Sequence, residues 1–346
     1  PYYSPDIYYL EALRRDPNYL PALKAIGEYY TRTLRFDEAL EYLERAYKIE
    51  CRYNQNPEDG SVNYLRAICL YELGNIDEAY NKFYRASWSN NVISPAMTAV
   101  AAIDGARGDY EAMYKHACQA IEKEARHPIA SCYAALALYK LGNTRKASAI
   151  CRDVLEKDRL NHLARYTLAI VTGRGRKGFY DGLLSDPAQT VLDLAFDLEF
   201  AGFVSDAATL VKGALEMTPD HAMLNYTLAY FCDILGQSRS LAKYRKAART
   251  QRIVSVFPSR AGEMRALKAA LAANAKDGFA AYLLGCILYN ARCYQKAAEL
   301  WEKAVKYVPD FYIPYRNLAL AYYNHLGRET DALPLMRKAI ELHDKD

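Results

Sequence analysis

The sequence predicts an all-α protein built from a repeated helical hairpin, and three observations favour this fold class. Segments with apolar residues at helical spacing come in pairs, short turns rich in Gly, Asn and Asp separate the members of a pair, and these turns recur about every 34 residues. Because one hairpin can bury its apolar face only against its neighbours, we expect about eight hairpins stacked into a right-handed α-α superhelix.

The clearest hairpin lies near the C-terminus. A first helix is expected over 281–289, a second over 294–304, and Pro309 ends the unit. Earlier turns show the period directly: Ala79 and Met113 are 34 residues apart (113 − 79), and so are Met113 and Ala147 (147 − 113). This spacing predicts further helical pairs over 188–217, 221–250 and 311–343.

The period is interrupted after residue 171, which predicts a division of the chain. We expect an N-terminal block of hairpins over 1–171, an irregular, basic and Gly-rich connector over 172–187, and a C-terminal block over 188–346, joined by one continuous seam. The stretch Gly173–Gly178 combines glycines with three cations and is the obvious candidate for an anion site. It lacks the pattern of a P-loop, so a flexible connector is the favoured interpretation and phosphate or nucleic-acid contact is the alternative.

Small residues recur where paired helices must approach closely, and large residues fill the gaps between them. Gly27, Gly285 and Ala319 are examples on first helices, and Trp301 is expected to lie in the core between two helices. We predict that Trp301→Ala lowers the free energy of unfolding by about 3–5 kcal/mol.

No arrangement of residues typical of catalysis or of metal binding is visible. The eight cysteines form no CxxC pair, no two of the six histidines are spaced for one helix face, and GxSxG and dinucleotide-binding fingerprints are missing. We therefore expect no metal site, no cofactor and no catalytic residue in this chain. The 45 basic and 41 acidic residues nearly balance, so RNA binding is the weakest hypothesis.

The segment that begins the sequence has neither a basic region nor an apolar core of the kind found in signal peptides. No apolar run approaches the length of a membrane-spanning helix. Together with the scattered cysteines, these features predict a cytoplasmic protein without a membrane partner. Ile7, Tyr8, Tyr9 and Leu10 open the first hairpin with an apolar surface, which predicts that another domain or a second copy covers it.

The 31 tyrosines are the main anomaly of composition, and they point to a binding function. Some fall one residue away from the apolar stripe of a first helix, on the side that lines the concave groove of a superhelix. Tyrosine offers a flat apolar ring with a polar tip, and Arg and Asn add directed hydrogen bonds, which suits a peptide or a sugar. The predicted groove residues are Tyr282, Tyr289, Asn290, Arg316, Asn317, Tyr323 and Asn324.

Segments 18–50, 61–90 and 278–343 resemble tetratricopeptide repeats, with a Gly or Ala in the first helix and an Ala–large–Ala pattern in the second. A narrower resemblance covers nearly the whole chain, to the repeat region of large bacterial proteins whose N-terminal part is a galactose-mutarotase-like β-sandwich domain. The segments that carry this resemblance are Tyr9–Pro17, Asn56–Gly60, Asp77–Tyr80, Ala86–Trp88, Leu283–Tyr289 and Arg316–Asn324.

Two functions follow as expectations. The first is a non-catalytic scaffold that binds a protein, a peptide or a β-sandwich domain of the same polypeptide through its groove. The alternative, implied by the narrower resemblance, is an accessory repeat domain of a bacterial carbohydrate-active protein related to glycoside hydrolases, whose catalytic domain lies outside this chain. A homodimer is left open.

Overall fold

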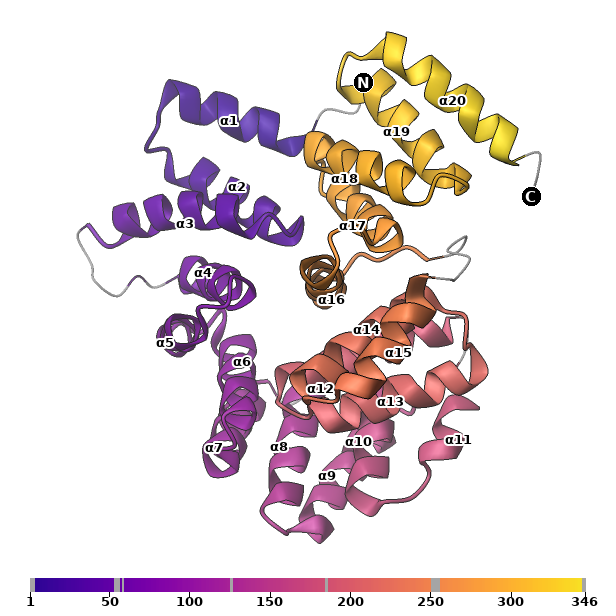
Figure 1. Ribbon diagram of the computed structural model, residues 1–346. Coiled ribbons are helices and arrows are strands. Elements are labelled where there is room, and N and C mark those ends of the chain that lie inside the picture. Colours follow the sequence, from indigo (N-terminus) through magenta and orange to yellow (C-terminus); the bar gives the residue numbers. More distant parts are fainter. Residues whose placement is uncertain are drawn as a thin grey trace. The chain divides into compact units, whose positions relative to one another are not determined.

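The computed structural model describes residues 4–52, 57, 59–124, 127–183, 186–249 and 256–343 (Figure 1). Every regular element within these residues is a helix, and no strand occurs among them. The expectation of an all-α repeat protein is therefore confirmed. The hand of the superhelix stays a prediction.

The helices follow one another with short connections. The earlier ones are α1 (Pro5–Arg15), α2 (Leu20–Arg32), α3 (Phe36–Glu50), α4 (Ser61–Glu72), α5 (Ile76–Ala86), α6 (Ile93–Ala106), α7 (Tyr110–Lys123), α8 (Pro128–Lys140), α9 (Thr144–Lys157) and α10 (His162–Thr172). The later ones are α11 (Arg176–Tyr180), α12 (Pro187–Phe200), α13 (Val204–Met217), α14 (Ala222–Ile234), α15 (Ser238–Arg249), α16 (Ala261–Ala273), α17 (Gly278–Asn290), α18 (Tyr294–Tyr307), α19 (Tyr312–His325) and α20 (Glu329–His343).

The chain divides into two compact units. The first contains residues 1–184 and 197–203, and the second contains residues 185–196 and 204–346, so α12 contributes to both. Within the first unit α2 packs on α3, α4 on α5, α6 on α7 and α8 on α9; within the second, α14 packs on α15, α17 on α18 and α19 on α20. The segment predicted to be an irregular connector contains the short helix α11.

One turn geometry recurs between the two helices of a hairpin. A residue with positive φ follows the first helix in each case: Leu34 (61°), Gly74 (87°), Gly108 (80°), Gly142 (82°), Gly202 (82°), Gly236 (68°) and Arg292 (61°). The N–H of the next residue then donates to a carbonyl five residues back: Arg35 to Tyr30 (2.9 Å), Asn75 to Leu70 (2.8 Å), Asp109 to Asp104 (3.0 Å), Asn143 to Leu138 (2.8 Å), Phe203 to Leu198 (2.8 Å), Gln237 to Cys232 (2.8 Å) and Cys293 to Leu288 (2.8 Å). This is the Schellman arrangement, which satisfies the carbonyls at a helix end and explains the preference for Gly at the left-handed position.

The seams between paired helices depend on small residues, as the sequence predicts. A Cβ atom added to Gly27 would lie 2.5 Å from Leu43 Cδ2, and one added to Gly285 would lie 2.5 Å from Trp301 Nε1. Trp301 is 2% exposed, which confirms its predicted place in the core. Its indole N–H donates to the carbonyl of Tyr282 at 3.1 Å, so the ring is held by packing and by a hydrogen bond.

A buried polar group fixes the start of α17 in the second unit. Asp277 accepts hydrogen bonds from the backbone N–H of Ala280 (3.1 Å) and from the Tyr226 hydroxyl (2.8 Å), and it pairs with Arg249 Nε at 2.7 Å. The carboxylate therefore caps α17 and ties it to α14 and α15. This network holds in place the helix on which three of the predicted binding residues lie.

Candidate functional site

The predicted binding residues of the second unit do not all reach the surface. Tyr282 is 3% exposed, and its ring packs edge-on against Phe311 with centroids 5.0 Å apart. Burial raises the pKa of Tyr282 well above its ordinary value, and the neighbouring Cys286 adds to the shift. Its ring is part of the seam between consecutive hairpins and offers almost no area to a ligand.

Tyr289 lies in a cluster of rings where α17, α18 and α19 meet. Its ring centroid is 5.1 Å from that of Tyr294, 5.2 Å from Trp301 and 5.6 Å from His325. The hydroxyl of Tyr289 is 3.1 Å from His325 Nε2, and the His325 ring stacks on Tyr294 at 3.7 Å. Burial, and secondarily the charge of Arg292, lowers the pKa of His325, which favours the neutral imidazole at pH 7.

The other predicted residues form an exposed face on α19. Arg316, Tyr323 and Asn324 are exposed and spaced seven and eight residues apart (323 − 316 and 324 − 316), which places them on one side of the helix. Tyr323 is 63% exposed. Arg316 donates from Nε and Nη2 to the side-chain oxygen of Asn317 at 3.3 and 3.2 Å, and the half-buried Asn317 thereby orients the guanidinium.

Leu320 belongs to the same face, although the sequence analysis did not single it out. It follows Arg316 by one helical turn, precedes Tyr323 by nearly another, and is 40% exposed. The helical period could have indicated Leu320 from the sequence. It lies on the same side of the helix as Arg316 and Tyr323 and therefore outside the apolar stripe. We call Arg316, Leu320, Tyr323 and Asn324 the α19 face. Asn290 is also exposed, at the end of α17.

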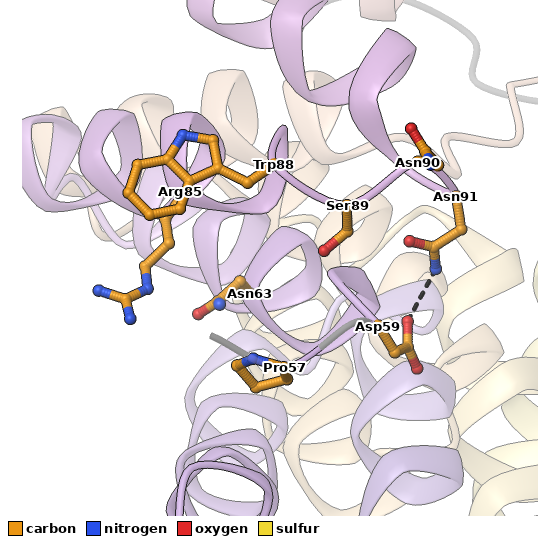
Figure 2. Close-up of a pocket in the computed structure, with 8 residues that line it drawn as sticks. All are labelled: Pro57, Asp59, Asn63, Arg85, Trp88, Ser89, Asn90 and Asn91. Carbon is orange, nitrogen blue, oxygen red and sulfur yellow. Dashed lines mark hydrogen bonds between the residues drawn. The ribbon is translucent and has the colours of Figure 1, made fainter. Parts of the chain in front are cut away.

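A second candidate surface lies in the first unit, in a cavity of about 650 Å³. Its lining combines amide, hydroxyl, carboxylate, guanidinium and indole groups from Pro57, Asp59, Asn63, Arg85, Trp88, Ser89, Asn90 and Asn91. Figure 2 shows Arg85 and Trp88 together on one side of the cavity and Asp59 bonded to Asn91 on the other. This cavity is not predictable from the sequence pattern, because it forms where the turn after α5 meets the start of α4.

Hydrogen bonds hold the polar wall of this cavity. Asn91 Nδ2 donates to Asp59 Oδ1 (2.7 Å) and to Ser61 Oγ (2.9 Å), and Asp59 also binds Lys24. Partial burial acts to raise the pKa of Asp59, but the hydrogen bonds from Lys24, Ser61 and Asn91 outweigh it and hold that pKa well below its usual range. The carboxylate is thus fixed as an anion in a structural network.

The opposite wall consists of Arg85 and Trp88. The Trp88 side chain is 63% exposed, and the Arg85 guanidinium lies 5.8 Å from the centre of its ring. An exposed indole can stack on a flat or apolar group, and the guanidinium beside it can bind an oxygen. A tryptophan directly after the apolar pattern of α5 is the sequence signal that could have indicated this wall.

In the described part of the chain, no group of three or more His, Cys, Asp or Glu side chains is arranged to hold a metal ion. All eight cysteines are free thiols, and burial raises the pKa of Cys69 and of Cys286 to about 11, so both stay protonated. Among the helices described, none combines the length and the apolar character needed to cross a bilayer.

Comparison with known proteins identifies the repeats. The tetratricopeptide repeat family model matches residues 25–91 and 282–346, which include α3–α5 and the α19 face. These two stretches are similar to tetratricopeptide repeats. The resemblance inferred from the sequence is therefore confirmed at this level for these two stretches, and neither match concerns a β-sandwich domain.

Solved structures that are similar to this chain match it at low identity and low TM-score. The chain is similar to MamA, residues 41 to the end, from Desulfovibrio magneticus RS-1 (17% identity, 61% of this chain and 92% of that chain covered, TM-score 0.25). It is similar to YrrB, described as a tetratricopeptide repeat protein with an unusual peptide-binding site (17% identity, 65% of this chain and 91% of that chain covered, TM-score 0.24). It is also similar to Naa15 in a complex of Naa15 and Naa10 bound to HypK-THB (16% identity, 98% of this chain and 60% of that chain covered, TM-score 0.32). Likeness at this level carries no information about what the present chain binds.

Proposed function

We propose that this chain is a non-catalytic scaffold that binds an extended peptide segment of a partner protein, and that the α19 face is its main contact surface. The observation that carries the proposal is the exposure of Arg316, Leu320, Tyr323 and Asn324 along one side of a helix whose opposite side is buried. Repeats of this family also supply extended binding surfaces rather than reaction centres.

The chemistry of the α19 face fits a peptide better than a small apolar molecule. Leu320 and Tyr323 offer area for an apolar side chain, and Tyr is enriched at protein interfaces because it combines a rigid ring with a polar tip. Asn324 presents both a donor and an acceptor, as a peptide backbone requires. Arg316, aligned by Asn317, can bind a carboxylate with two parallel hydrogen bonds.

Tyr289, Asn290 and Asn317 are proposed as supporting residues. Tyr289 and Asn317 position exposed neighbours, through the hydroxyl contact with His325 and through the bond to Arg316. Asn290 is exposed and can itself contact the peptide. Tyr282, which packs against Phe311, is left out of the binding surface.

Two further expectations about partners remain proposals. Ile7, Tyr8 and Leu10 are exposed on α1, which supports a second docking surface there for a β-sandwich domain of the same polypeptide or for another copy of this chain. The eight free thiols favour a reducing compartment such as the cytoplasm. The accessory role in a carbohydrate-active protein gains no support from the family match, which concerns the repeats alone.

Peptide selection tests the main proposal. The chain is immobilised, a random dodecapeptide library displayed on phage is panned against it, and the selected peptides are measured by fluorescence anisotropy. We expect peptides of micromolar affinity, and we expect Arg316→Ala and Tyr323→Ala to weaken binding about tenfold each.

The matched controls are Arg337→Ala and Leu333→Ala, which remove an exposed cation and an exposed apolar side chain from α20. Both controls should leave the affinity unchanged. Selected peptides that bind the Arg316 and Tyr323 variants as tightly as the parent chain would show that the α19 face is not the binding surface.

A further inference from the structure

A second cavity of the first unit gathers arginines from three successive segments. Its volume is about 710 Å³, and Arg152 of α9, Arg165 of α10 and Arg174 of the following turn all line it. No Asp or Glu is among its lining residues. Three guanidinium groups around one cavity without a carboxylate form a site of positive potential.

Two of these arginines are available to a ligand. Among the described residues, neither Arg152 nor Arg174 takes part in an ion pair, and both are exposed. The acidic neighbour of Arg152 in sequence, Asp153, is instead paired with Lys157 at 2.6 Å. The nearest carboxylate to the glycine wall is that of Asp181, 3.9 Å from the position that a Cβ atom on Gly178 would take. Asp181 itself is not among the residues that line the cavity.

Arg165 is held in a fixed orientation. Its Nη1 donates to the carbonyl of Gly182 at 3.2 Å, and its guanidinium lies 5.5 Å from the centre of the Phe179 ring. A side chain anchored at one nitrogen still has other N–H groups free to donate, and little entropy is lost when it binds a ligand. Arg165 thus supplies a held donor, in contrast to the exposed Arg152 and Arg174.

The glycines of the turn expose its backbone. Gly173 and Gly175 have φ of 67° and 83°, and nothing lies within 4 Å of a Cβ atom added to either. The turn therefore needs glycine for its conformation and not for close packing, and the open space leaves room for an anion beside Gly175, which lines the cavity. Glycines in such conformations form concave anion sites in many phosphate-binding proteins.

The rest of the lining is partly apolar. Leu155 and Leu168 are half-buried apolar residues of the lining, Ala169 and Phe179 are buried, and Thr144 and Thr172 add hydroxyl groups. An inorganic anion would leave the two leucines unused, whereas an organic group attached to a phosphate would bury them.

We propose that this cavity binds the phosphate monoester of a small organic molecule, with Arg152, Arg165 and Arg174 on the phosphate and the side chains of Leu155 and Leu168 against the organic part. Planar guanidinium groups match the geometry of phosphate oxygens and bind them through paired hydrogen bonds. This site is independent of the α19 face and of the proposed scaffold function.

Isothermal titration calorimetry with phenyl phosphate tests the proposal. At constant ionic strength we expect saturable binding of phenyl phosphate, weaker binding of inorganic phosphate, and no binding of phenol. Arg174→Gln and Arg152→Gln should each weaken phenyl phosphate binding about tenfold, since each removes one charge-assisted contact. A peptide that carries phosphotyrosine serves as a further arm: tighter binding than phenyl phosphate would identify a protein side chain, and not a free metabolite, as the source of the phosphate.

The matched control is Arg159→Gln, which removes the same charge from an exposed position beyond the cavity. It should leave the affinity unchanged. The proposal is overturned if 10 mM phenyl phosphate gives no binding, or if Arg159→Gln weakens binding as much as Arg174→Gln does. Circular dichroism of each variant shows whether the helices are retained.

Discussion

In the hairpins α2–α3 and α17–α18 the paired helices approach closely at a glycine, but different side chains pack against that glycine. In the first, Gly27 lies under the aliphatic side chain of Leu43; in the second, Gly285 lies under the indole of Trp301. The indole also donates a hydrogen bond to the Tyr282 carbonyl, and no comparable donor exists on leucine. The backbone repeat is therefore preserved while the side chain that fills the seam changes in volume and in chemistry.

This difference separates what each repeat must keep from what it can vary. In these two hairpins the first helix requires glycine, because a Cβ atom at Gly27 or Gly285 would overlap the partner side chain. The partner itself is free to be aliphatic or aromatic as long as it fills the space. In the α17–α18 hairpin the aromatic choice brings Tyr289 and His325 into contact, so the seam there supports the exposed residues beside it.

The largest expected effect comes from emptying the two seams. Trp301→Ala should lower the free energy of unfolding by about 3–5 kcal/mol and Leu43→Ala by about 2–5 kcal/mol, because each leaves a cavity that the helices fill only in part. Urea unfolding followed by far-UV circular dichroism measures both. A loss below 1 kcal/mol for Trp301→Ala would contradict its role in the core.

The next largest effect on the free energy of unfolding comes from adding a methyl group at the two glycines, and we expect its size to differ between the two hairpins. Gly285→Ala and Gly27→Ala should each cost about 1–3 kcal/mol, since the new methyl group lies within 3 Å of its partner. We expect the larger loss at Gly285, where the hydrogen-bonded indole has less freedom to move than Leu43. The same urea titrations compare the two variants, and equal losses would show that the hydrogen bond does not stiffen the seam.

The turns of the same two hairpins predict an effect of opposite sign. Leu34 and Arg292 occupy the left-handed position that Gly occupies elsewhere, at a cost of about 1–2 kcal/mol for a residue with a side chain. Leu34→Gly should therefore stabilise the chain by about 1 kcal/mol, and Gly142→Ala should destabilise it by about 1 kcal/mol. Thermal unfolding measures both. The control Leu141→Gly, at a residue with φ of −79°, should bring no gain.

The smallest predicted effect concerns pH. His127 Nδ1 accepts from the N–H of Ala130 (3.1 Å) and His221 Nδ1 from that of Leu224 (3.2 Å), so only an imidazole with an unprotonated Nδ1 can cap α8 and α14. Burial lowers the pKa of both histidines below the value of about 6.5 in an unfolded chain. As the pH falls below about 6.5 the unfolded chain takes up protons first, so this stabilisation is complete at higher pH and is lost as the pH falls through the folded-state pKa.

Replacing both histidines by Asn, another capping residue, should preserve stability at pH 7.5 and reduce its loss at pH 5. The midpoint of thermal unfolding at the two pH values is the measurement. An unchanged difference between pH 7.5 and pH 5 in the double variant would show that other groups carry the pH dependence.

The sequence predicted the seams well because each depends on a local rule. The positions of Gly27, Gly285 and Trp301 follow from the helical period and from the space between two helices, and no knowledge of neighbouring hairpins is needed. The surfaces were harder to predict because they depend on those neighbours. Tyr282 has the spacing of a groove residue, yet Phe311 at the start of the next hairpin covers it.

The two cavities depend on contacts between segments that the spacing of residues in the sequence does not predict. The wall made by Arg85 and Trp88 meets the Asp59 network only because the turn after α5 returns to the start of α4. The basic segment Gly173–Gly178 was recognised from its composition, but Arg152 and Arg165 join it from two earlier helices. A pattern of local residues indicates a candidate anion site and does not show which distant cations complete it.

We infer that the contacts between paired helices determine stability, whereas the α19 face determines peptide binding. Thermal unfolding and peptide affinity are measured on the same two variants, Gly285→Ala and Tyr323→Ala, with one selected peptide. We expect Gly285→Ala to unfold at a lower temperature and to bind normally below it, and Tyr323→Ala to unfold as the parent does and to bind about tenfold more weakly. Normal binding by Tyr323→Ala together with weakened binding by the still folded Gly285→Ala would contradict the claim.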